Sequence, residues 1–224
     1  NNLANLADLG LDVKNYIFDI ESGIKVNEYI ENATTFDAHY LKAKKEEVAN
    51  ILKKVHSSGK VLEGEFRVFD EIRKYESLIE GNISYSYYEK IREKVFSLQN
   101  HLEEIGIDRK SCHIDLVPEN FIEDETGRIY LIDWEYSAMN DPMWDLAALF
   151  LESEFTKQEE DDFLSYYESD RTPVSREKIR IYKILKDTIW SLWTVYKEAQ
   201  GADFGEYGVS RYQRAVDGLA YYGG

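Results

Sequence analysis

The spacing of apolar residues along the chain predicts short β-hairpins separated by longer helices. The segments "YIFDI" and "IKVNEYI" alternate apolar and polar residues on either side of Ser22-Gly23, which is typical of a β-hairpin. The segments "NFIED" and "RIYLIDW" flank the turn "ETG" in the same way. We therefore expect two strand pairs that lie far apart in the sequence.

Between the hairpins, apolar residues recur at the three- and four-residue spacing of amphipathic helices. This spacing predicts helices over residues 40–56, 66–80 and 87–105. Gly81 and Gly106 are the expected stop signals of the last two. The first residues, "NNLANLADLGLD", indicate the end of a further helix that runs into a glycine.

Helical spacing resumes after the second hairpin with "MWDLAALFLESEF". Thr156 and Glu159 form a capping box for the next helix. A long helix is expected from Ser175 to about Gln200, and it is buried because nearly every face is apolar from Ile184 onward. Hairpins followed by runs of helices indicate an α+β architecture with a mostly helical main lobe.

The composition narrows the classes of function. The 224 residues suffice for one large or two small domains, and 43% are hydrophobic. The net charge of −16 repels nucleic acid and anionic lipid, and the apolar runs are too short for membrane insertion. The single cysteine, Cys112, allows no internal disulfide, which fits a reducing compartment such as the cytoplasm. We interpret Cys112 as a small buried strand residue and not as a nucleophile.

The segment "HIDLVPEN" carries the candidate chemistry. It contains His113 and Asp115, followed by Asn120, and Asp133 comes at the end of the second hairpin. Phosphoryl transfer from ATP to an alcohol needs a base for the hydroxyl proton and oxygen ligands for Mg²⁺. Asp115 fits the base, Asn120 and Asp133 fit the metal ligands, and His113 fits a residue that holds the loop by hydrogen bonds. The alternative is that these are ordinary turn residues.

Aromatic residues on the long helix suggest the acceptor. Trp190 and Trp193 share a helix face, which Tyr196 continues. Aromatic faces bind quaternary ammonium ions, although such a stripe on a buried helix can also be simple core. Further walls and a counter-charge are offered by Tyr136, Tyr207 and Glu152.

The stretch "CHIDLVPENFI…IYLIDWEYSAMNDPMWDLAALF" resembles the choline kinase and aminoglycoside phosphotransferase superfamily. Together with "IWSLWTVYKE" and "YGVSRYQRAV", it is most similar to bacterial choline kinases of the phosphorylcholine-incorporation (lic) type. The resemblance implies a protein-kinase-like bilobal α+β fold with a large, mainly helical C-lobe. It places a remnant of the N-lobe and the hinge in residues 1–31, and the C-lobe with the catalytic loop and acceptor pocket in residues 32–224.

The resemblance also implies roles for residues. It makes Asp115 the catalytic base and Asn120 and Asp133 the ligands of magnesium. Asp145, in "DPMWDLA", would anchor the backbone of the catalytic loop from the first turn of a helix. The role of Glu135 stays open between a second metal ligand and a contact with the acceptor.

The segment "VNEYIE" matches the family's hinge, where backbone groups of Glu28, Tyr29 and Ile30 would bond the adenine of ATP. The tryptophans of "WSLW" match a pair that lines the choline pocket of choline kinases. The family's phosphate-covering loop and the lysine of its third strand would lie upstream of Asn1. Most of the N-lobe is therefore expected to be absent from this sequence, which by itself should hold ATP poorly.

The expected activity is transfer of the γ-phosphoryl group of ATP to choline, giving phosphocholine for cell-surface decoration. A related small-alcohol kinase acting on ethanolamine or an aminoglycoside is the first alternative. A non-catalytic choline-binding pseudokinase module is the second. The presence of Asp115, Asn120 and Asp133 together favours catalysis, because a pure binding module has no need of all three.

Overall fold

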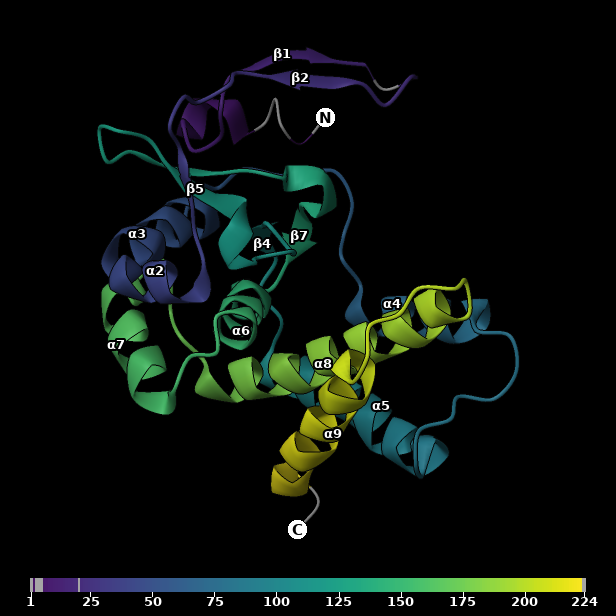
Figure 1. Cartoon of the computed structure of the whole chain (residues 1–224). Helices are drawn as coiled ribbons and strands as arrows, with labels where there is room; N and C mark the ends of the chain where they lie inside the picture. The colour runs from purple at the N-terminus through teal and green to yellow at the C-terminus, as the bar shows by residue number, and fades with distance from the viewer. Residues whose placement is uncertain (1, 3–5, 20, 223–224) are drawn as a thin grey trace. The chain divides into compact units, whose positions relative to one another are not determined.

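A computed structural model describes residue 2, residues 6–19 and residues 21–222 of the chain (Figure 1). The chain divides into two compact units. Unit 1 combines Asn1–Gly64 with Lys110–Val174, and unit 2 combines Glu65–Arg109 with Ser175–Gly224. The expected functional boundary between residues 31 and 32 is a different kind of division, and it stays a prediction.

Unit 1 contains small antiparallel sheets, and both predicted hairpins are confirmed. In the first hairpin Asn15 pairs with Asn27, and in the second Ile122 pairs with Tyr130. The strands of unit 1 are β1 (Asn15–Phe18) with β2 (Lys25–Asn27), β3 (Thr34–Thr35) with β5 (Phe121–Glu123) and β6 (Ile129–Leu131), and β4 (Lys110–Cys112) with β7 (Ala138–Asn140).

Three of the four α-helices in the described part of unit 1 begin at a capping side chain: Asp37, Asp141 or Thr156. The α6 helix starts after Asp141, whose side chain accepts from the backbone N–H of Met143, and Pro142 occupies its first turn. The capping box predicted at Thr156 and Glu159 is confirmed. The helices of this unit are α2 (Ala38–Ala43), α3 (Lys45–His56), α6 (Pro142–Glu152) and α7 (Lys157–Tyr167), with 3-10 turns η1 (Ala7–Leu9), η2 (Pro118–Asn120) and η3 (Trp134–Tyr136).

The expectation of one continuous helix over residues 40–56 is wrong. The helix starts earlier, because the Asp37 side chain caps the N–H of Tyr40, and it breaks at Lys44, where φ is −105° and ψ is 23°. The ammonium group of Lys44 forms an ion pair with Glu123 of β5, at 2.8 Å. The first residues show a short η1 turn that ends at Gly10 in the left-handed conformation, and residues 1 and 3–5 lie outside the described part.

The core of unit 1 surrounds α6, which is buried from Pro142 to Phe150. The α3 helix packs on α7 and on β4, and α6 also packs on β4. Cys112, the last residue of β4, is fully buried, and burial raises the pKa of its thiol well above the usual value. The prediction of a buried strand cysteine is therefore confirmed.

Unit 2 is built from helices, which are labelled α4, α5, α8 and α9 in Figure 1. The long α8 helix is buried over most of its length, as predicted. Glycine allows α9 to approach it closely, because a Cβ atom at Gly208 would lie 2.7 Å from the Thr194 side chain, and one at Gly218 would lie 2.7 Å from Ile184. The helices of unit 2 are α4 (Val68–Leu78), α5 (Tyr88–Ile105), α8 (Arg176–Glu198) and α9 (Tyr207–Leu219), followed by η4 (Ala220–Tyr222).

No helix within the described residues is long and apolar enough to cross a lipid bilayer.

Candidate active site

The segment "HIDLVPEN" forms a loop that begins directly after β4 and ends in η2, just before β5. We call residues 113–120 the catalytic loop, after the role that the sequence predicts for Asp115. His113 is fully buried at its start, and the ring Nε2 donates a hydrogen bond to the carbonyl oxygen of Ile132, at 2.8 Å. Burial lowers the pKa of His113, which favours the neutral ring. This bond ties the catalytic loop to the end of β6, where Asp133 is the next residue.

Asp145 contacts the backbone of the catalytic loop directly. It is fully buried in the first turn of α6. Its Oδ2 accepts from the backbone N–H of His113 at 2.8 Å, and its Oδ1 accepts from that of Ile114 at 2.9 Å. The neighbouring Trp144 donates its Nε1–H to the carbonyl oxygen of Ile114, at 2.9 Å. The α6 helix therefore holds the loop backbone immediately before Asp115.

The backbone of Ile114 is strained, with φ at 77°. A β-branched residue rarely adopts this left-handed conformation, which costs ~1–3 kcal/mol and persists only where the surroundings fix it. The hydrogen bonds from Asp145 and Trp144 provide this restraint. Strain held beside a candidate base is typical of functional sites.

The two predicted metal ligands line the same pocket. Asn120 is buried, and its Nδ2 donates to the backbone carbonyl oxygen of Asp115 at 2.8 Å. Because the amide nitrogen donates to the loop, the amide oxygen is the atom that a hard cation would take. Asp133 is exposed at the end of β6 and has a left-handed backbone, with φ at 64°. A carboxylate and an amide oxygen in one pocket fit the ligand preference of Mg²⁺.

This pocket, which we call the hinge pocket, has a volume of about 660 Å³. Such a volume is within the range of ~300–1,000 Å³ that is usual for ligand sites. The three predicted hinge residues, Glu28, Tyr29 and Ile30, line it together with Asn120 and Asp133. The remaining lining residues are Val13, Lys25, Asn27, Asn32, Ala33, Thr35, Ile122 and Ile132.

Negative charge gathers beside the hinge pocket. Burial raises the pKa of Asp12, and the nearby charge of Asp133 adds to the rise, while Lys25 opposes it. Carboxylates that disfavour each other's ionised form are stabilised by a bound cation. This edge of the pocket therefore suits a divalent ion or a cationic group.

The sequence did not reveal the apolar lining of the hinge pocket. Ile122 could have been inferred, because it lies on β5 of the predicted second hairpin, two residues after Asn120. Val13 and Thr35 could not have been inferred, because Val13 lies in a loop and Thr35 lies in a two-residue strand, and neither segment shows a periodic pattern.

The tryptophans predicted to bind the acceptor lie on α8 of unit 2. The rings of Trp190 and Trp193 are 5.4 Å apart, with their planes at 87°. Phe204 lies 4.9 Å from Trp193 and 6.5 Å from Tyr207, so it joins the tryptophans to the predicted Tyr207. We call these four rings the aromatic row. Phe204 was missed because it stands alone in a polar connecting segment.

A cation already lies over one ring of the aromatic row. The ammonium group of the buried Lys186 is 5.0 Å from the centre of the Trp190 ring. The row is therefore able to hold positive charge within the protein itself. Tyr196, which was predicted to continue the same face, lies near Tyr75, with ring centres 6.3 Å apart, and its contact with the acceptor stays a prediction.

The remaining predicted acceptor residues belong to unit 1. Tyr136 and Glu135 are exposed on η3, directly after Asp133, and Tyr136 has 55% of its surface exposed. Glu152 is the last residue of α6 and is partly exposed. Their contact with the acceptor stays a prediction.

Residues 15–180 match the model of the choline/ethanolamine kinase family. Over 217 residues the chain is 33% identical to a LicA protein of Haemophilus influenzae, a match that covers 92% of this chain and 64% of that protein. It is 32% identical to LicA of the H. influenzae strain KW20, covering 92% of this chain and 81% of that protein. The chain thus spans less than two thirds of the first of these relatives.

Solved structures of LicA proteins also match this chain. The crystal structure of choline kinase LicA from Streptococcus pneumoniae shares 71% sequence identity and a TM-score of 0.94, and the match covers 99% of this chain and 79% of that chain. LicA in complex with AMP matches with a TM-score of 0.95 and 71% identity, covering 99% of this chain and 77% of that chain. Aminoglycoside 2'-phosphotransferase-IIIa, 14% identical with a TM-score of 0.64, shares only the fold; that match covers 97% of this chain and 80% of that chain.

These matches confirm the predicted kinase-like α+β fold. The residues that match the family model contain the catalytic loop, Asp133 and Asp145. The chain belongs to the choline/ethanolamine kinase family.

Proposed function

We propose that this chain forms the larger part of a choline kinase, which transfers the γ-phosphoryl group of ATP to the hydroxyl of choline. One observation supports the transfer most strongly. Asp115 follows a loop backbone fixed by Asp145, while Asn120 and Asp133 line one pocket with the hinge residues. A base and two oxygen ligands beside a nucleotide-sized pocket are the parts that phosphoryl transfer requires.

Each residue then has a distinct task. Asp115 accepts the proton of the acceptor hydroxyl and orients its oxygen toward the phosphorus. The side-chain oxygens of Asn120 and Asp133 hold Mg²⁺, which supplies neutralisation of the phosphate charge. Backbone groups of residues 28–30 bond the adenine. Asp145 keeps the base in place through the loop backbone.

The aromatic row supports choline as the acceptor. A trimethylammonium group cannot donate hydrogen bonds, so it is recognised by aromatic faces, whereas a primary ammonium gains more from acidic groups. The row of Trp190, Trp193, Phe204 and Tyr207 provides such faces. Tyr136 and Glu152 stay predicted contacts of the acceptor, as a further ring and a counter-charge.

Ethanolamine is the second candidate acceptor, because the family model covers kinases of both alcohols. We expect the reaction in the cytoplasm, where ATP is supplied, and we expect phosphocholine to serve cell-surface decoration.

An acceptor panel tests the proposal. The protein expressed from its whole coding sequence is incubated with ATP and Mg²⁺ and with choline, ethanolamine or an aminoglycoside, and both ADP and the phosphorylated product are measured. We expect the highest kcat/KM for choline. A preference for one of the other acceptors would contradict the assignment, and choline binding without turnover would favour the non-catalytic module.

A further inference from the structure

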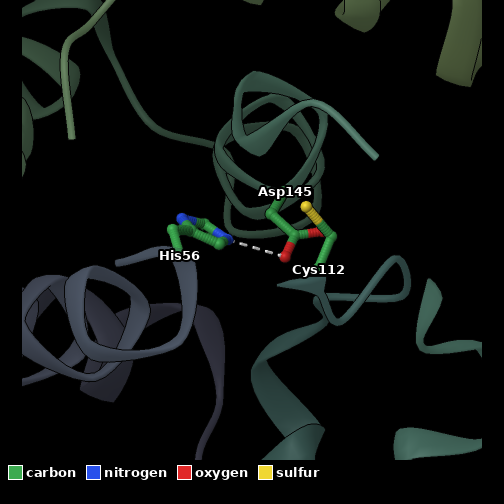
Figure 2. A group of neighbouring side chains, drawn as sticks. All are labelled: His56, Cys112 and Asp145. Atoms are coloured by element: carbon green, nitrogen blue, oxygen red, sulfur yellow. Dashed lines mark hydrogen bonds and ion pairs between the residues drawn. The ribbon is translucent and has the colours of Figure 1, made fainter. Parts of the chain in front are cut away.

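A buried polar cluster lies beside the catalytic loop, and two of its three side chains, His56 and Cys112, have no assigned task in the proposed reaction. His56 ends α3, Cys112 ends β4, and Asp145 lies in the first turn of α6 (Figure 2). The three side chains are at most 1% exposed, and their potential ligand atoms lie within 4.8 Å of one another. Such a cluster is either a metal site or a hydrogen-bonded support.

The hydrogen bonds favour a support. Both carboxylate oxygens of Asp145 already accept backbone N–H groups of the loop. The thiol of Cys112 faces the carbonyl oxygen of Asn140 at 3.4 Å, and burial raises its pKa, which disfavours the thiolate that metals bind. A metal ion here would have to displace the bonds that hold the loop.

The ring of His56 connects three helices. Its Nε2 lies 3.0 Å from Oδ2 of Asp145, and Nδ1 lies 2.8 Å from the hydroxyl of Tyr167, the last residue of α7. A carboxylate only accepts, so Nε2 carries the hydrogen in its contact with Asp145, and Nδ1 shares the second hydrogen bond with the Tyr167 hydroxyl. Figure 2 shows the His56 ring pointing at the carboxylate.

We propose that His56 is a positioning residue for the catalytic loop: by donating to Asp145, it fixes the carboxylate that holds the backbone of His113 and Ile114. The effect on catalysis rests on the proposed function, whereas the effect on the loop backbone does not.

The physical reason lies in the freedom of an aspartate side chain. Its terminal torsion has a broad energy profile, so its own rotamer does not orient the two oxygens. Three donors define that orientation: the backbone N–H groups of His113 and Ile114 and the ring N–H of His56. Without His56, the carboxylate can rotate and the strained Ile114 can relax. Displacement of a catalytic group by ~1 Å costs on the order of 10²-fold in rate.

The test compares two substitutions at one position in the protein from the whole coding sequence. His56→Leu removes both hydrogen bonds, while His56→Gln retains an N–H donor that can reach Asp145. We expect His56→Leu to lower kcat about 10- to 100-fold with little change in KM for ATP or choline. Amide hydrogen exchange at His113 and Ile114 should accelerate. His56→Gln should restore most of kcat and most of the protection of these two amides from exchange.

Leu52→Ala is the matched control, since Leu52 is fully buried one turn earlier on α3. It should destabilise the helix without a selective loss of kcat. If His56→Leu does not fold, Tyr167→Phe provides a milder test, because it removes the hydroxyl and keeps the ring, and a smaller change in the same direction is expected.

Unchanged exchange at both amides in a folded His56→Leu protein would overturn the proposal. An equal loss of kcat in Leu52→Ala would do the same, and so would a stoichiometric metal ion that is lost with His56. A wild-type protein without turnover would instead refute the proposed function, while the exchange measurement would still decide the role of His56.

Discussion

Replacing Asp145 with Asn isolates the contribution of one carboxylate to the catalytic loop. The change keeps the size of the side chain and replaces one acceptor oxygen with an amide nitrogen, which only donates. In the native protein Oδ2 accepts from His113 and His56, and Oδ1 accepts from Ile114. The amide has two possible orientations, and the one that keeps two of the three hydrogen bonds places its oxygen at the Oδ2 position. The amide nitrogen then faces the N–H of Ile114.

The magnitude follows from these three bonds. One hydrogen bond to a charged acceptor is lost, at ~1.5–3 kcal/mol. The two that remain become neutral bonds of roughly half the strength, which costs a similar amount again. A neutral amide is easier to bury than a carboxylate, so the net loss is smaller than the sum, about 2–4 kcal/mol. Ordinary proteins have ~5–15 kcal/mol of stability, so the variant should still fold.

The loss of rate should exceed what reduced stability explains. Once Asp145 no longer accepts from Ile114, the strain at φ 77° relaxes and the backbone before Asp115 moves. We expect kcat of the folded variant to fall on the order of 10²-fold. The assays are urea unfolding followed by tryptophan fluorescence, steady-state turnover with choline, and amide exchange at His113 and Ile114.

Asp162→Asn is the control for Asp145→Asn, because it makes the same chemical change at an exposed ion pair with Lys45. It should change the stability little, because solvent screens this ion pair, and it should leave turnover unchanged. The reasoning is refuted if folded Asp145→Asn has wild-type turnover and wild-type exchange at the two loop amides.

Three further predictions concern the metal, the acceptor and the effect of pH. Asp133→Ala should raise the Mg²⁺ concentration needed for half-maximal rate and lower that rate, because a carboxylate ligand is lost; an unchanged Mg²⁺ titration would place the metal elsewhere. Trp190→Leu and Trp193→Leu should each weaken choline binding tenfold or more, since a desolvated cation–π contact contributes ~2 kcal/mol, and should reduce the preference for choline over ethanolamine; a wild-type preference in both would make the pair simple core. The pKa of His113 is lowered from 6.5 by burial, so the unfolded chain takes up this proton at higher pH than the folded protein does. The contribution of His113 to the free energy of unfolding should be complete above pH 6.5 and should decrease as the pH falls below that value. In His113→Gln the free energy of unfolding should depend less on pH in this range. An equal pH dependence in both proteins would show that other groups cause it.

The parts of the site that are close in sequence could be predicted from it. The spacing from Asp115 to Asn120 lies within one loop, and Asp133 follows from the hairpin β5–β6, whose turn residues and alternating pattern are clear. The capping box at Thr156 and the start of the long helix at Ser175 could also be predicted, because each depends on residues a few positions apart.

Contacts between distant segments could not be predicted. His56 and Asp145 are 89 positions apart, and no spacing rule relates the end of one helix to the start of another. The strands β4 and β7 pair although β5 and β6 lie between them in the sequence, so no tight turn indicates that they pair. The break at Lys44 was hidden because apolar residues keep helical spacing across it.

The aromatic residues of α8 show a different limit. A stripe of rings at helical spacing fits both a packed core and a pocket for a cation. The ring contacts of Trp193 with Phe204, and the ammonium group of Lys186 over Trp190, needed the folded arrangement to become visible.

The proposed role of Asp115 as the base of a choline kinase can be tested by a single comparison. Wild-type protein and Asp115→Asn are measured side by side for turnover of choline with ATP and Mg²⁺, and for equilibrium binding of choline and ATP. The carboxylate is needed when the hydroxyl proton leaves and not for binding in the ground state. We therefore predict that turnover is abolished while both affinities stay nearly unchanged. Near-normal turnover of Asp115→Asn would contradict the account.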